Sequence, residues 1–382
     1  MKNFHKIIIS VFFFFVIAFI PIISLITMPR ERLAFSENEN RYLARFPLLS
    51  FDRVVDASFM KGFEDWANDR VFGRESWIKL KHASERTIGK LEIGGTYTAD
   101  NRIMQAWNEY NEASVNRNLA AMNAFAKRHG DVPVYLMIAP SSIEIYRDSL
   151  PRSVPVGSQK DFIKYCYDEL TELTSVDVLY LMEEFSDGYI YYRTDHHWTS
   201  EGAYIAYTAL GGAMNFTPLG LNSFDVENAS NSFRGTLFSR TLDEKITPDI
   251  IKFYTLYDGD PDVLLKVNNG MDVSEHDSLY FREYLEVKDK YSAFLGTQVP
   301  VVNIYTDIPG SSKRLLIFKD SYAHSLVPFL TKNFNEITMV DLRFINTRYS
   351  DVINVDKYDA VLFIYNAITF SEDTNLIKLG RE

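Results

Sequence analysis

The sequence predicts an α/β protein in which a mostly parallel sheet is flanked by helices and preceded by one N-terminal transmembrane helix. Three observations support this prediction. Short and nearly continuous apolar runs alternate with helical patterns, as expected for buried parallel strands joined by helices. A long uncharged run lies at the N-terminus. The composition, with 46% hydrophobic and 24% charged residues, is that of a globular chain and excludes disorder and collagen-like repeats.

The N-terminal run covers residues 7–28, which hold no charge and include four consecutive phenylalanines. At about 1.5 Å per residue this gives about 33 Å of helix, against roughly 30 Å of hydrocarbon in a bilayer. A cleaved signal peptide is the alternative, but its apolar region is roughly 7–15 residues long and ends at a small-residue site. Residues 23–27 offer no such site. We therefore expect residues 1–28 to be an uncleaved signal anchor.

The charges around this run set its orientation. Lys2 and Lys6 precede it and favour a cytoplasmic N-terminus, although Arg30 and Arg32 weaken that bias. The rest of the chain is then extracytoplasmic, held at the cell membrane by a single pass. Residues 29–382 are acidic, with 38 Lys and Arg against 51 Asp and Glu. An acidic chain without a basic stripe is a poor binder of nucleic acid, so no nucleic-acid partner is expected.

The exported part shows no Pro/Gly/Ser-rich linker that would divide it. Polar residues 29–60 are expected to form a juxtamembrane stalk. Residues 61–382 are expected to form one α/β domain, with an acidic and irregular insertion at about 215–300. The apolar periodicity and the capping residues predict helices over 59–91, 118–129, 158–173, 199–214 and 322–332, and strands over 132–138, 176–181, 189–192, 314–318, 336–340 and 360–365.

The first chemical signal is the run Thr194-Asp195-His196-His197-Trp198, on a loop between a strand-like segment and a helix. Sites in α/β folds lie on such loops at strand ends. In extended backbone, residues two apart point the same way, so Asp195 and His197 are expected on one side and His196 on the other. A carboxylate beside an imidazole fixes its tautomer, as a general base requires. His196 and Trp198 are expected to pack around the site.

Two other interpretations of this run remain. Asp195 and His197 can be a structural hydrogen-bonded pair. The same residues can also ligate a metal, but no His-x₃-His pair or carboxylate cluster nearby completes a coordination set. We therefore expect neither a metal nor a cofactor.

The second chemical signal is Lys319-Asp320-Ser321-Tyr322, where a buried strand runs into a helix. Ser321 can cap the helix, or it can be a nucleophile whose oxyanion is stabilised by the N–H groups at the helix start. Asp320 can take the capping role and free Ser321. With the Asp-x-His loop, Ser321 completes a nucleophile, a base and an orienting carboxylate. His324 is the competing base, because it follows Ser321 by three residues.

These motifs resemble a known family. The run 194–198 resembles the motif for which the DHHW proteins are named, a family similar to the alginate O-acetylation proteins AlgJ and AlgX. The resemblance covers nearly all of residues 30–370, and its other segments are 39–43, 63–66, 138–140, 319–322, 340–343 and 359–363. It implies an SGNH-hydrolase-like catalytic domain with Ser321 as nucleophile, His197 as base and Asp195 as the carboxylate that orients His197.

The sequence departs from the general SGNH pattern in two ways. In SGNH enzymes the serine comes first and the Asp-x-x-His comes late, whereas here the order is reversed, as in the alginate proteins. The usual Gly before Asp-Ser is Lys319 here, so the standard oxyanion hole is not expected in full. Arg343 and Asn366, near the ends of late strands, are candidates to complete that hole or to bind substrate.

Together these features predict a membrane-anchored O-acetyltransferase that moves acetyl groups to hydroxyls of a cell-surface or secreted polysaccharide. Acetyl-CoA is absent outside the membrane, and the resemblance implies a multi-spanning MBOAT acyltransferase as the partner that supplies the acetyl group. One rival is a carbohydrate acetylesterase with the same triad, which differs only in using water as acceptor. The other is a non-catalytic polysaccharide-binding scaffold of an exopolysaccharide complex.

Overall fold

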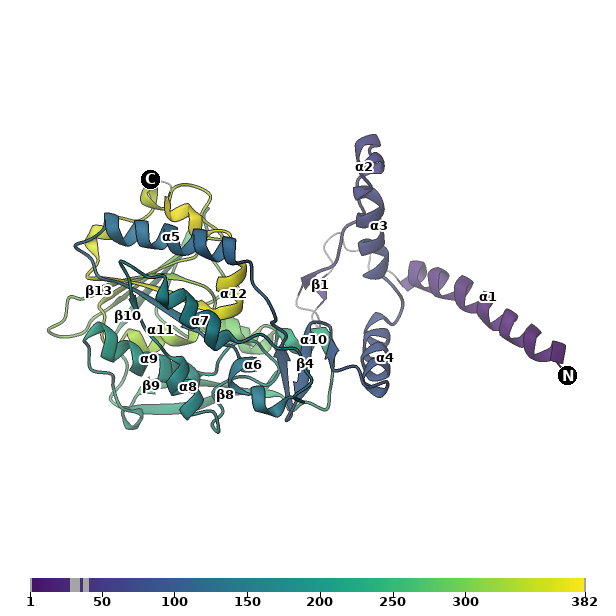
Figure 1. Cartoon of the computed structure of the whole chain (residues 1–382), viewed down its shortest axis with the longest axis horizontal. Coiled ribbons are helices and arrows are strands. Elements are labelled where there is room, and N and C mark those ends of the chain that lie inside the picture. The colour runs from purple at the N-terminus through teal and green to yellow at the C-terminus, as the bar shows by residue number, and fades with distance from the viewer. Residues whose placement is uncertain (1, 28–34, 37–40, 381–382) are drawn as a thin grey trace. The chain divides into compact units, whose positions relative to one another are not determined.

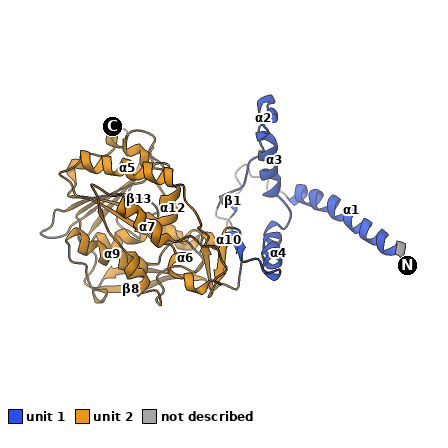
Figure 2. Cartoon of the chain, viewed as in Figure 1, with its two compact units in different colours: residues 1–94, 238–244 blue, residues 95–237, 245–382 orange. Residues whose placement is uncertain are grey.

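The computed structural model describes residues 2–27, 35–36 and 41–380. The chain divides into two compact units (Figure 2): unit 1 holds residues 1–94 and 238–244, and unit 2 holds residues 95–237 and 245–382. Residues 29–34 and 37–40 of the expected stalk lie outside the described residues.

Unit 1 is built mainly from helices (Figure 1). Its elements are α1 (Lys2–Thr27), β1 (Phe35–Ser36), β2 (Arg41–Tyr42), α2 (Phe51–Val55), α3 (Ser58–Asn68), α4 (Arg74–Thr87) and β3 (Glu92–Ile93). The single helix expected over 59–91 is interrupted at Gly73, whose φ of +66° is left-handed and favours glycine. Among the described residues, α1 is the helix that is long and apolar enough to cross a membrane, and a signal sequence would have the same properties.

Unit 2 is centred on an eight-stranded sheet with the order β11-β10-β12-β14-β13-β15-β6-β7. The strands are β6 (Val134–Ala139), β7 (Thr174–Ser175), β10 (Val263–Asn268), β11 (Val273–His276), β12 (Val301–Thr306), β13 (Arg314–Lys319), β14 (Glu336–Val340) and β15 (Ala360–Asn366). β14, β13, β15, β6 and β7 pair in parallel, whereas β12, β10 and β11 pair antiparallel. The sheet is therefore mixed, because the expected parallel strands are extended at one edge by antiparallel β12, β10 and β11. β10 and β11 come from the range 215–300 that was expected to be irregular.

The five parallel strands have a doubly wound order. If β13 is counted first and β6 and β7 are counted after β15, the order β14-β13-β15-β6-β7 reads 2-1-3-4-5, as in flavodoxin-like sheets. The first of these strands along the chain, β6, thus occupies the position of the fourth strand in that order. In such sheets ligands bind at the carboxyl ends of the strands where the strand order reverses. Here that point lies between β13 and β15, whose ends lead to Ser321 and Asn366.

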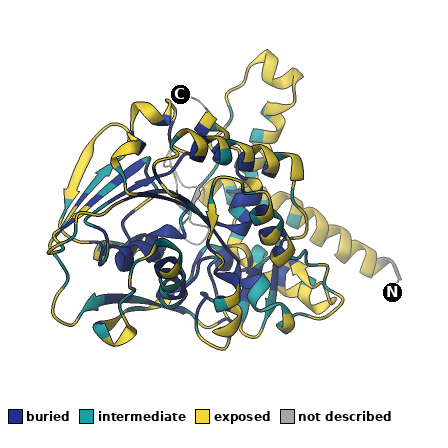
Figure 3. Cartoon of the chain, turned by 60° about the vertical axis from the view of Figure 1, so that its left-hand side comes forward, coloured by how far each residue is buried: buried dark blue, intermediate teal, exposed yellow. Residues whose placement is uncertain are grey.

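Helices cover both faces of the sheet (Figure 1). One hydrophobic core joins the sheet to α5 (Glu112–Arg128), α7 (Gln159–Asp168) and α12 (Ala367–Glu372), and the other joins it to α8 (Leu179–Glu184), α9 (Ser200–Met214) and α11 (Ala323–Leu330). Alternate residues of β13 enter opposite cores: Leu315 and Ile317 face α9 and α11, and Leu316 and Phe318 face α5. Figure 3 shows the buried strands between these partly exposed helices.

Smaller elements complete unit 2. They are β4 (Thr96–Ala99) paired with β5 (Arg102–Gln105), α6 (Ser142–Ile145), β8 (Phe224–Phe233) paired with β9 (Asp249–Leu256), and α10 (Thr236–Thr241), within which the division between the units falls. The remaining turns are short 3₁₀ helices over 147–149, 221–223, 282–286, 290–293, 349–351, 355–357 and 376–380.

Most expected elements are confirmed, with shifts of a few residues at their ends. Ser158 and Thr199 cap α7 and α9 as expected, accepting hydrogen bonds from the N–H groups of Asp161 and Gly202. The strands expected over 176–181 and 189–192 are wrong: α8 begins in the first range, and the second forms an isolated bridge between Tyr191 and Trp198 instead of a strand. A short apolar run does not separate strand from helix, and the carboxylate of Asp177 accepts the N–H of Leu179 and starts the helical turn.

Candidate active site

Ser321 lies in the turn between β13 and α11, at the carboxyl end of the strand. The preceding carboxylate fixes this turn: Asp320 Oδ1 accepts the N–H of Tyr322 at 2.9 Å, and Asp320 Oδ2 accepts the N–H of Asn366 at 2.7 Å. Asp320 therefore ties the β13 turn to the end of β15. Asp320 does not cap α11 as expected, since Tyr322 is at the N-cap without a side-chain hydrogen bond. The Asp320 carboxylate nevertheless fixes the turn and leaves the Ser321 hydroxyl for another partner.

That partner is His197, as the sequence predicted. His197 Nε2 lies 2.6 Å from Ser321 Oγ, and His197 Nδ1 lies 2.5 Å from Asp195 Oδ1. The His197 backbone N–H also donates to Asp195 Oδ1, at 3.0 Å. With Nδ1 donating to the carboxylate, Nε2 is left to accept the serine proton. The structure thus brings Asp195, His197 and Ser321 together in the geometry that a serine nucleophile requires.

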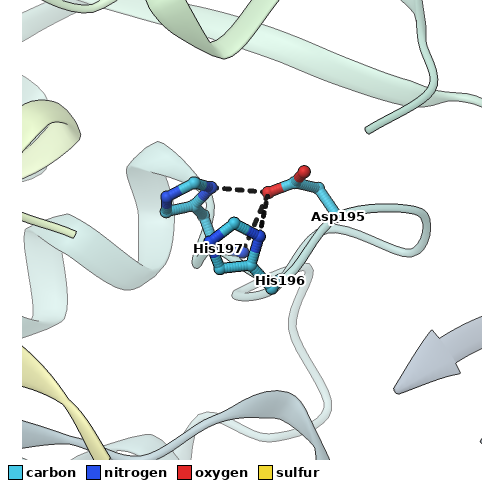
Figure 4. Close-up of side chains that lie close together, drawn as sticks. All are labelled: Asp195, His196 and His197. Carbon is cyan, nitrogen blue, oxygen red and sulfur yellow. Dashed lines mark hydrogen bonds and ion pairs between the residues drawn. The ribbon is translucent and has the colours of Figure 1, made fainter. Parts of the chain in front are cut away.

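The position of His196 differs from the expectation. Its ring lies 3.8 Å from the His197 ring, and its Nδ1 lies 3.5 Å from Asp195 Oδ1, so both imidazoles lie beside the same carboxylate (Figure 4). The expectation of opposite sides assumed extended backbone, whereas residues 193–197 form a series of bends. His196 Nδ1 also lies 2.8 Å from Thr236 Oγ1. His196 is therefore the partly exposed neighbour of the buried base.

The first residue of α10 binds the other oxygen of Asp195. Thr236 donates to Asp195 Oδ2 from its N–H, at 2.8 Å, and from its hydroxyl, at 3.1 Å. A Cβ on Gly235 would lie 2.2 Å from the same oxygen, so only glycine fits there. Neither Gly235 nor Thr236 was predicted from the sequence, because both lie about forty positions from the motif in the range expected to be an irregular insertion. The only sequence signal was an Arg-Gly-Thr run between a strand and a helix.

A buried carboxylate fixes the shape of the motif loop. Asp249, at the start of β9, accepts the N–H groups of Arg193 and Thr194 at 2.7 and 2.8 Å, the Thr194 hydroxyl at 2.5 Å and the Tyr189 hydroxyl at 2.5 Å. Four donors satisfy this carboxylate although burial raises its pKa. Asp249 therefore acts as the anchor of residues 193–194, one position before Asp195.

Aromatic side chains enclose the base. The ring of Tyr291 stacks on the His197 ring, with centroids 3.7 Å apart and planes 7° apart. The Tyr291 hydroxyl donates to the Ser321 carbonyl at 3.0 Å and lies 3.1 Å from Ser325 Oγ. The Trp198 indole N–H lies 3.1 Å from the Tyr322 carbonyl and 3.0 Å from Ser325 Oγ. These contacts join the motif loop, the range 290–293 and the start of α11 into one packed site.

The neighbouring histidines favour the ionised form of Asp195, which faces His197. Burial alone would raise the pKa of Asp195, but His196, His197 and the hydrogen bonds to its oxygens outweigh burial and hold the pKa well below its usual range. An ionised carboxylate at this place can stabilise a positive charge on the His197 ring.

The competing base, His324, has other partners. Its Nε2 lies 2.7 Å from Lys319 Nζ, and its Nδ1 lies 3.0 Å from the carbonyl of Phe294. Burial and the neighbouring ammonium keep the pKa of His324 well below its usual range. His324 is thus a neutral, buried acceptor for Lys319, and the structure places His197 rather than His324 against Ser321.

The two substrate-binding candidates lie near the same sheet edge. Asn366 is buried: its Oδ1 accepts the N–H of Ile368 at 3.0 Å, and its Nδ2 donates to the Ala139 carbonyl at 3.3 Å. Arg343 is partly exposed and makes a two-pronged ion pair with the buried Asp341, at 2.9 and 2.6 Å. Their roles in substrate binding stay predictions.

Metal binding by the motif would compete with these hydrogen bonds. Asp195, His196 and His197 offer ligand atoms within 4.8 Å of one another. The same Asp195 oxygen and His197 Nδ1 are joined at 2.5 Å, and a bound cation would have to replace that bond. The contacts present therefore fit a serine site better than a metal site.

This chain matches one protein family and one curated relative. The DHHW protein family matches residues 92–340. A curated relative from Pseudomonas putida, described as probable alginate O-acetylase AlgJ, is 24% identical over 184 residues, which are 46% of this chain and 42% of the relative. The match therefore spans less than half the length of that relative.

Solved structures share the fold. A DHHW family protein from Eubacterium siraeum has a TM-score of 0.65 and 24% identity, over 76% of this chain and 96% of that one. Bacillus cereus PatB1 has a TM-score of 0.63 and 21% identity, over 74% of this chain and 99% of that one. At these identities the likeness concerns the fold alone.

Proposed function

This chain belongs to the DHHW protein family, and from that membership and its serine site we propose that it is an extracytoplasmic O-acetyltransferase acting on polysaccharide hydroxyls. The observation that carries the proposal is the continuous chain of contacts from Asp195 through His197 to Ser321, at 2.5 and 2.6 Å. The likeness to a probable alginate O-acetylase supports the reaction class. The domain is SGNH-hydrolase-like in this proposal, consistent with its 2-1-3-4-5 strand order.

In the first half-reaction, the acetyl group moves to the serine. His197 Nε2 takes the proton of Ser321 Oγ as that oxygen attacks the acetyl carbonyl. Backbone N–H groups of Ser321 and Ala323, at the start of α11, stabilise the tetrahedral oxyanion. The imidazolium, stabilised by Asp195, then gives its proton to the departing donor group, and acetyl-Ser321 remains.

In the second half-reaction, a sugar hydroxyl replaces the donor. His197 takes the hydroxyl proton, the sugar oxygen attacks the acetyl-serine carbonyl, and the proton passes to Ser321 Oγ as the ester bond breaks. Ser321 is regenerated and the sugar carries the acetyl ester. Arg343 is proposed to bind the polysaccharide at the rim, since it is partly exposed and Asp341 holds its guanidinium in place. The closely bonded Asn366 amide is proposed to keep the β15 end in place beside the serine.

The location and the partner are part of the same proposal. α1 is proposed to be a single-pass anchor with the rest of the chain outside the membrane, because its apolar stretch of 24 residues is long enough to cross a bilayer. An acetyl donor is then needed outside, and an MBOAT-type membrane acyltransferase is proposed to supply it. Neither a metal nor a cofactor is part of the mechanism.

The test is acetyl transfer by the detergent-solubilised full chain, with p-nitrophenyl acetate as donor and an oligosaccharide as acceptor. Mass spectrometry of the sugar and an assay of free acetate distinguish the outcomes. Acetylated sugar supports the proposal, free acetate alone favours the acetylesterase, and neither product favours the scaffold. The Ser321→Ala variant must lose the transfer, while Ser312→Ala, which changes an exposed serine before β13, must retain it.

A further inference from the structure

The segment between α1 and the α/β domain carries an unusual apolar surface. Neither α2 nor α3 contains a buried residue. Large apolar side chains there are nevertheless frequent, and eight of them form what we name the juxtamembrane apolar surface: Phe46, Leu48, Leu49, Phe51, Val54, Val55, Met60 and Phe63, exposed by between 38% and 83%. So many exposed apolar side chains in so short a segment mark a contact surface.

The pattern is that of an interfacial helix. Phe59, Phe63 and Trp66 follow one another at helical spacing on α3, while Lys61, Glu64 and Asp65 lie between them. The ring of Phe46 contacts all three aromatic rings, with centroids between 5.0 and 6.4 Å away. An amphipathic helix with an aromatic apolar face and a charged opposite face is typical of segments that lie at a membrane surface.

Contacts within unit 1 bring α3 to the last turns of α1. The N–H of Phe72 donates to Ser24 Oγ at 2.8 Å. A cavity of about 300 Å³ is lined on one side by Ile20, Pro21, Ser24 and Leu25 of α1, and on the other by Phe63, Trp66, Ala67, Arg70 and Val71. If α1 spans the bilayer, its final turns lie at the outer boundary, so the α3 side chains that contact them lie at the same depth.

Basic residues lie on both sides of α2 and α3. Residues 41–91 carry 10 Lys and Arg against 7 Asp and Glu; the excess lies in 41–50 and 70–91, with 8 bases against 2 acids, while 51–69 carry 2 against 5. Residues 92–382 carry 26 against 41, so the flanking bases are attracted to anionic headgroups and the acidic remainder is repelled by them.

We propose that the juxtamembrane apolar surface is inserted into the headgroup region of the outer leaflet, so that α2 and α3 lie on the membrane beside the anchor. The occupant is lipid, because the surface adjoins the apolar α1 and is flanked by basic residues. This inference rests on the membrane anchor of the proposed function and is independent of the serine chemistry.

The test places a fluorescent label, NBD, on a cysteine at Phe51→Cys in the full chain, reconstituted into phosphatidylcholine–phosphatidylglycerol vesicles without any other protein. The native Cys166 is buried and its pKa is raised to about 12 by burial, so the introduced thiol takes the label. The label is expected to lose most of its emission to nitroxide-bearing lipids and little to aqueous iodide. A matched label at Val226→Cys, on the exposed part of β8, is expected to behave in the opposite way.

A third label, at Phe12→Cys in α1, separates the possible failures. If this label is quenched by the lipid nitroxide while the Phe51 label is as accessible to iodide as the Val226 label, the inference is wrong and the surface faces water rather than lipid. If the Phe12 label is also accessible to iodide, the anchor fails and the inference fails with it. Acetyl transfer, assayed on the same samples, reports separately on the catalytic proposal.

Discussion

Units 1 and 2 differ in how far they bury their apolar side chains. All seven residues of β15 are buried, as are five of the six of β13, whereas α2 and α3 bury none. The charges differ too, with a net excess of bases over residues 41–91 and of acids over 92–382. Unit 2 thus holds a core that stabilises its site, while the apolar side chains of α2 and α3 in unit 1 stay exposed. Substitutions in the two units should therefore differ in which property they change.

The largest effect is expected at Asp195. In Asp195→Asn the side chain keeps its shape but no longer carries the charge that orients His197 and stabilises its imidazolium. The acetyl-transfer kcat is expected to fall about 10⁴-fold, as for the same change in serine triads. Urea unfolding of the variant should show a loss of about 1–3 kcal/mol, because the amide NH₂ faces N–H donors that a carboxylate oxygen accepted. A loss smaller than tenfold would mean that Asp195 has only a structural role.

Removal of a core ring tests the stability of unit 2. Phe363 is fully buried and stacks on Phe318, with centroids 4.9 Å apart and planes 13° apart. Phe363→Ala is expected to lower the free energy of unfolding by about 3–5 kcal/mol, because it leaves a cavity between the sheet and α5. Denaturant unfolding followed by tryptophan fluorescence measures this change. A cost under about 1 kcal/mol would show that the core can collapse into the space.

Gly235→Ala is expected to damage the site more than the fold. The added methyl group would lie 2.2 Å from Asp195 Oδ2, so the carboxylate must move away from Thr236. We expect a loss of about 1–3 kcal/mol in stability, as for overpacking elsewhere, and a fall in kcat with little change in KM. Gly212→Ala is the matched control, because a Cβ there contacts nothing within 4 Å. Equal effects of the two substitutions would contradict this prediction.

The contrast between Gly235 and His197 shows which site residues could be predicted from the sequence. Asp195, His197 and Ser321 were predictable, because each adjoins a strand or helix signal and the chemistry needs those residue types together. Gly235, Thr236 and Asp249 were not, because they come from distant segments and their contacts depend on tertiary packing. The antiparallel part of the sheet was not predicted for a similar reason. The local pattern of residues 263–276 does not indicate that these strands pair with an edge of the parallel sheet.

A smaller effect is expected from the buried charge of Lys319. Burial lowers the pKa of this ammonium from 10.5 to about 8, although the nearby Asp341 partly opposes the shift. Between about pH 8 and 10 the unfolded chain binds the proton that the folded chain has lost, so stability rises with pH by up to about 1.4 kcal/mol per unit. The free energy of unfolding of the wild type should therefore rise relative to that of Lys319→Met over this pH range. A pH-independent difference between the two would show that Lys319 keeps its ordinary pKa.

The smallest effect on folding is expected at Phe51, the counterpart of Phe363 in unit 1. Its side chain is 83% exposed, so Phe51→Ala removes almost no contact with the protein. The free energy of unfolding in detergent should change by less than about 0.5 kcal/mol, as for other surface positions. The two Phe→Ala variants, measured side by side, then differ by several kcal/mol although they remove the same ring. A cost at Phe51 above about 1 kcal/mol would mean that protein, not lipid, covers this ring, and the contrast between the two units would fail.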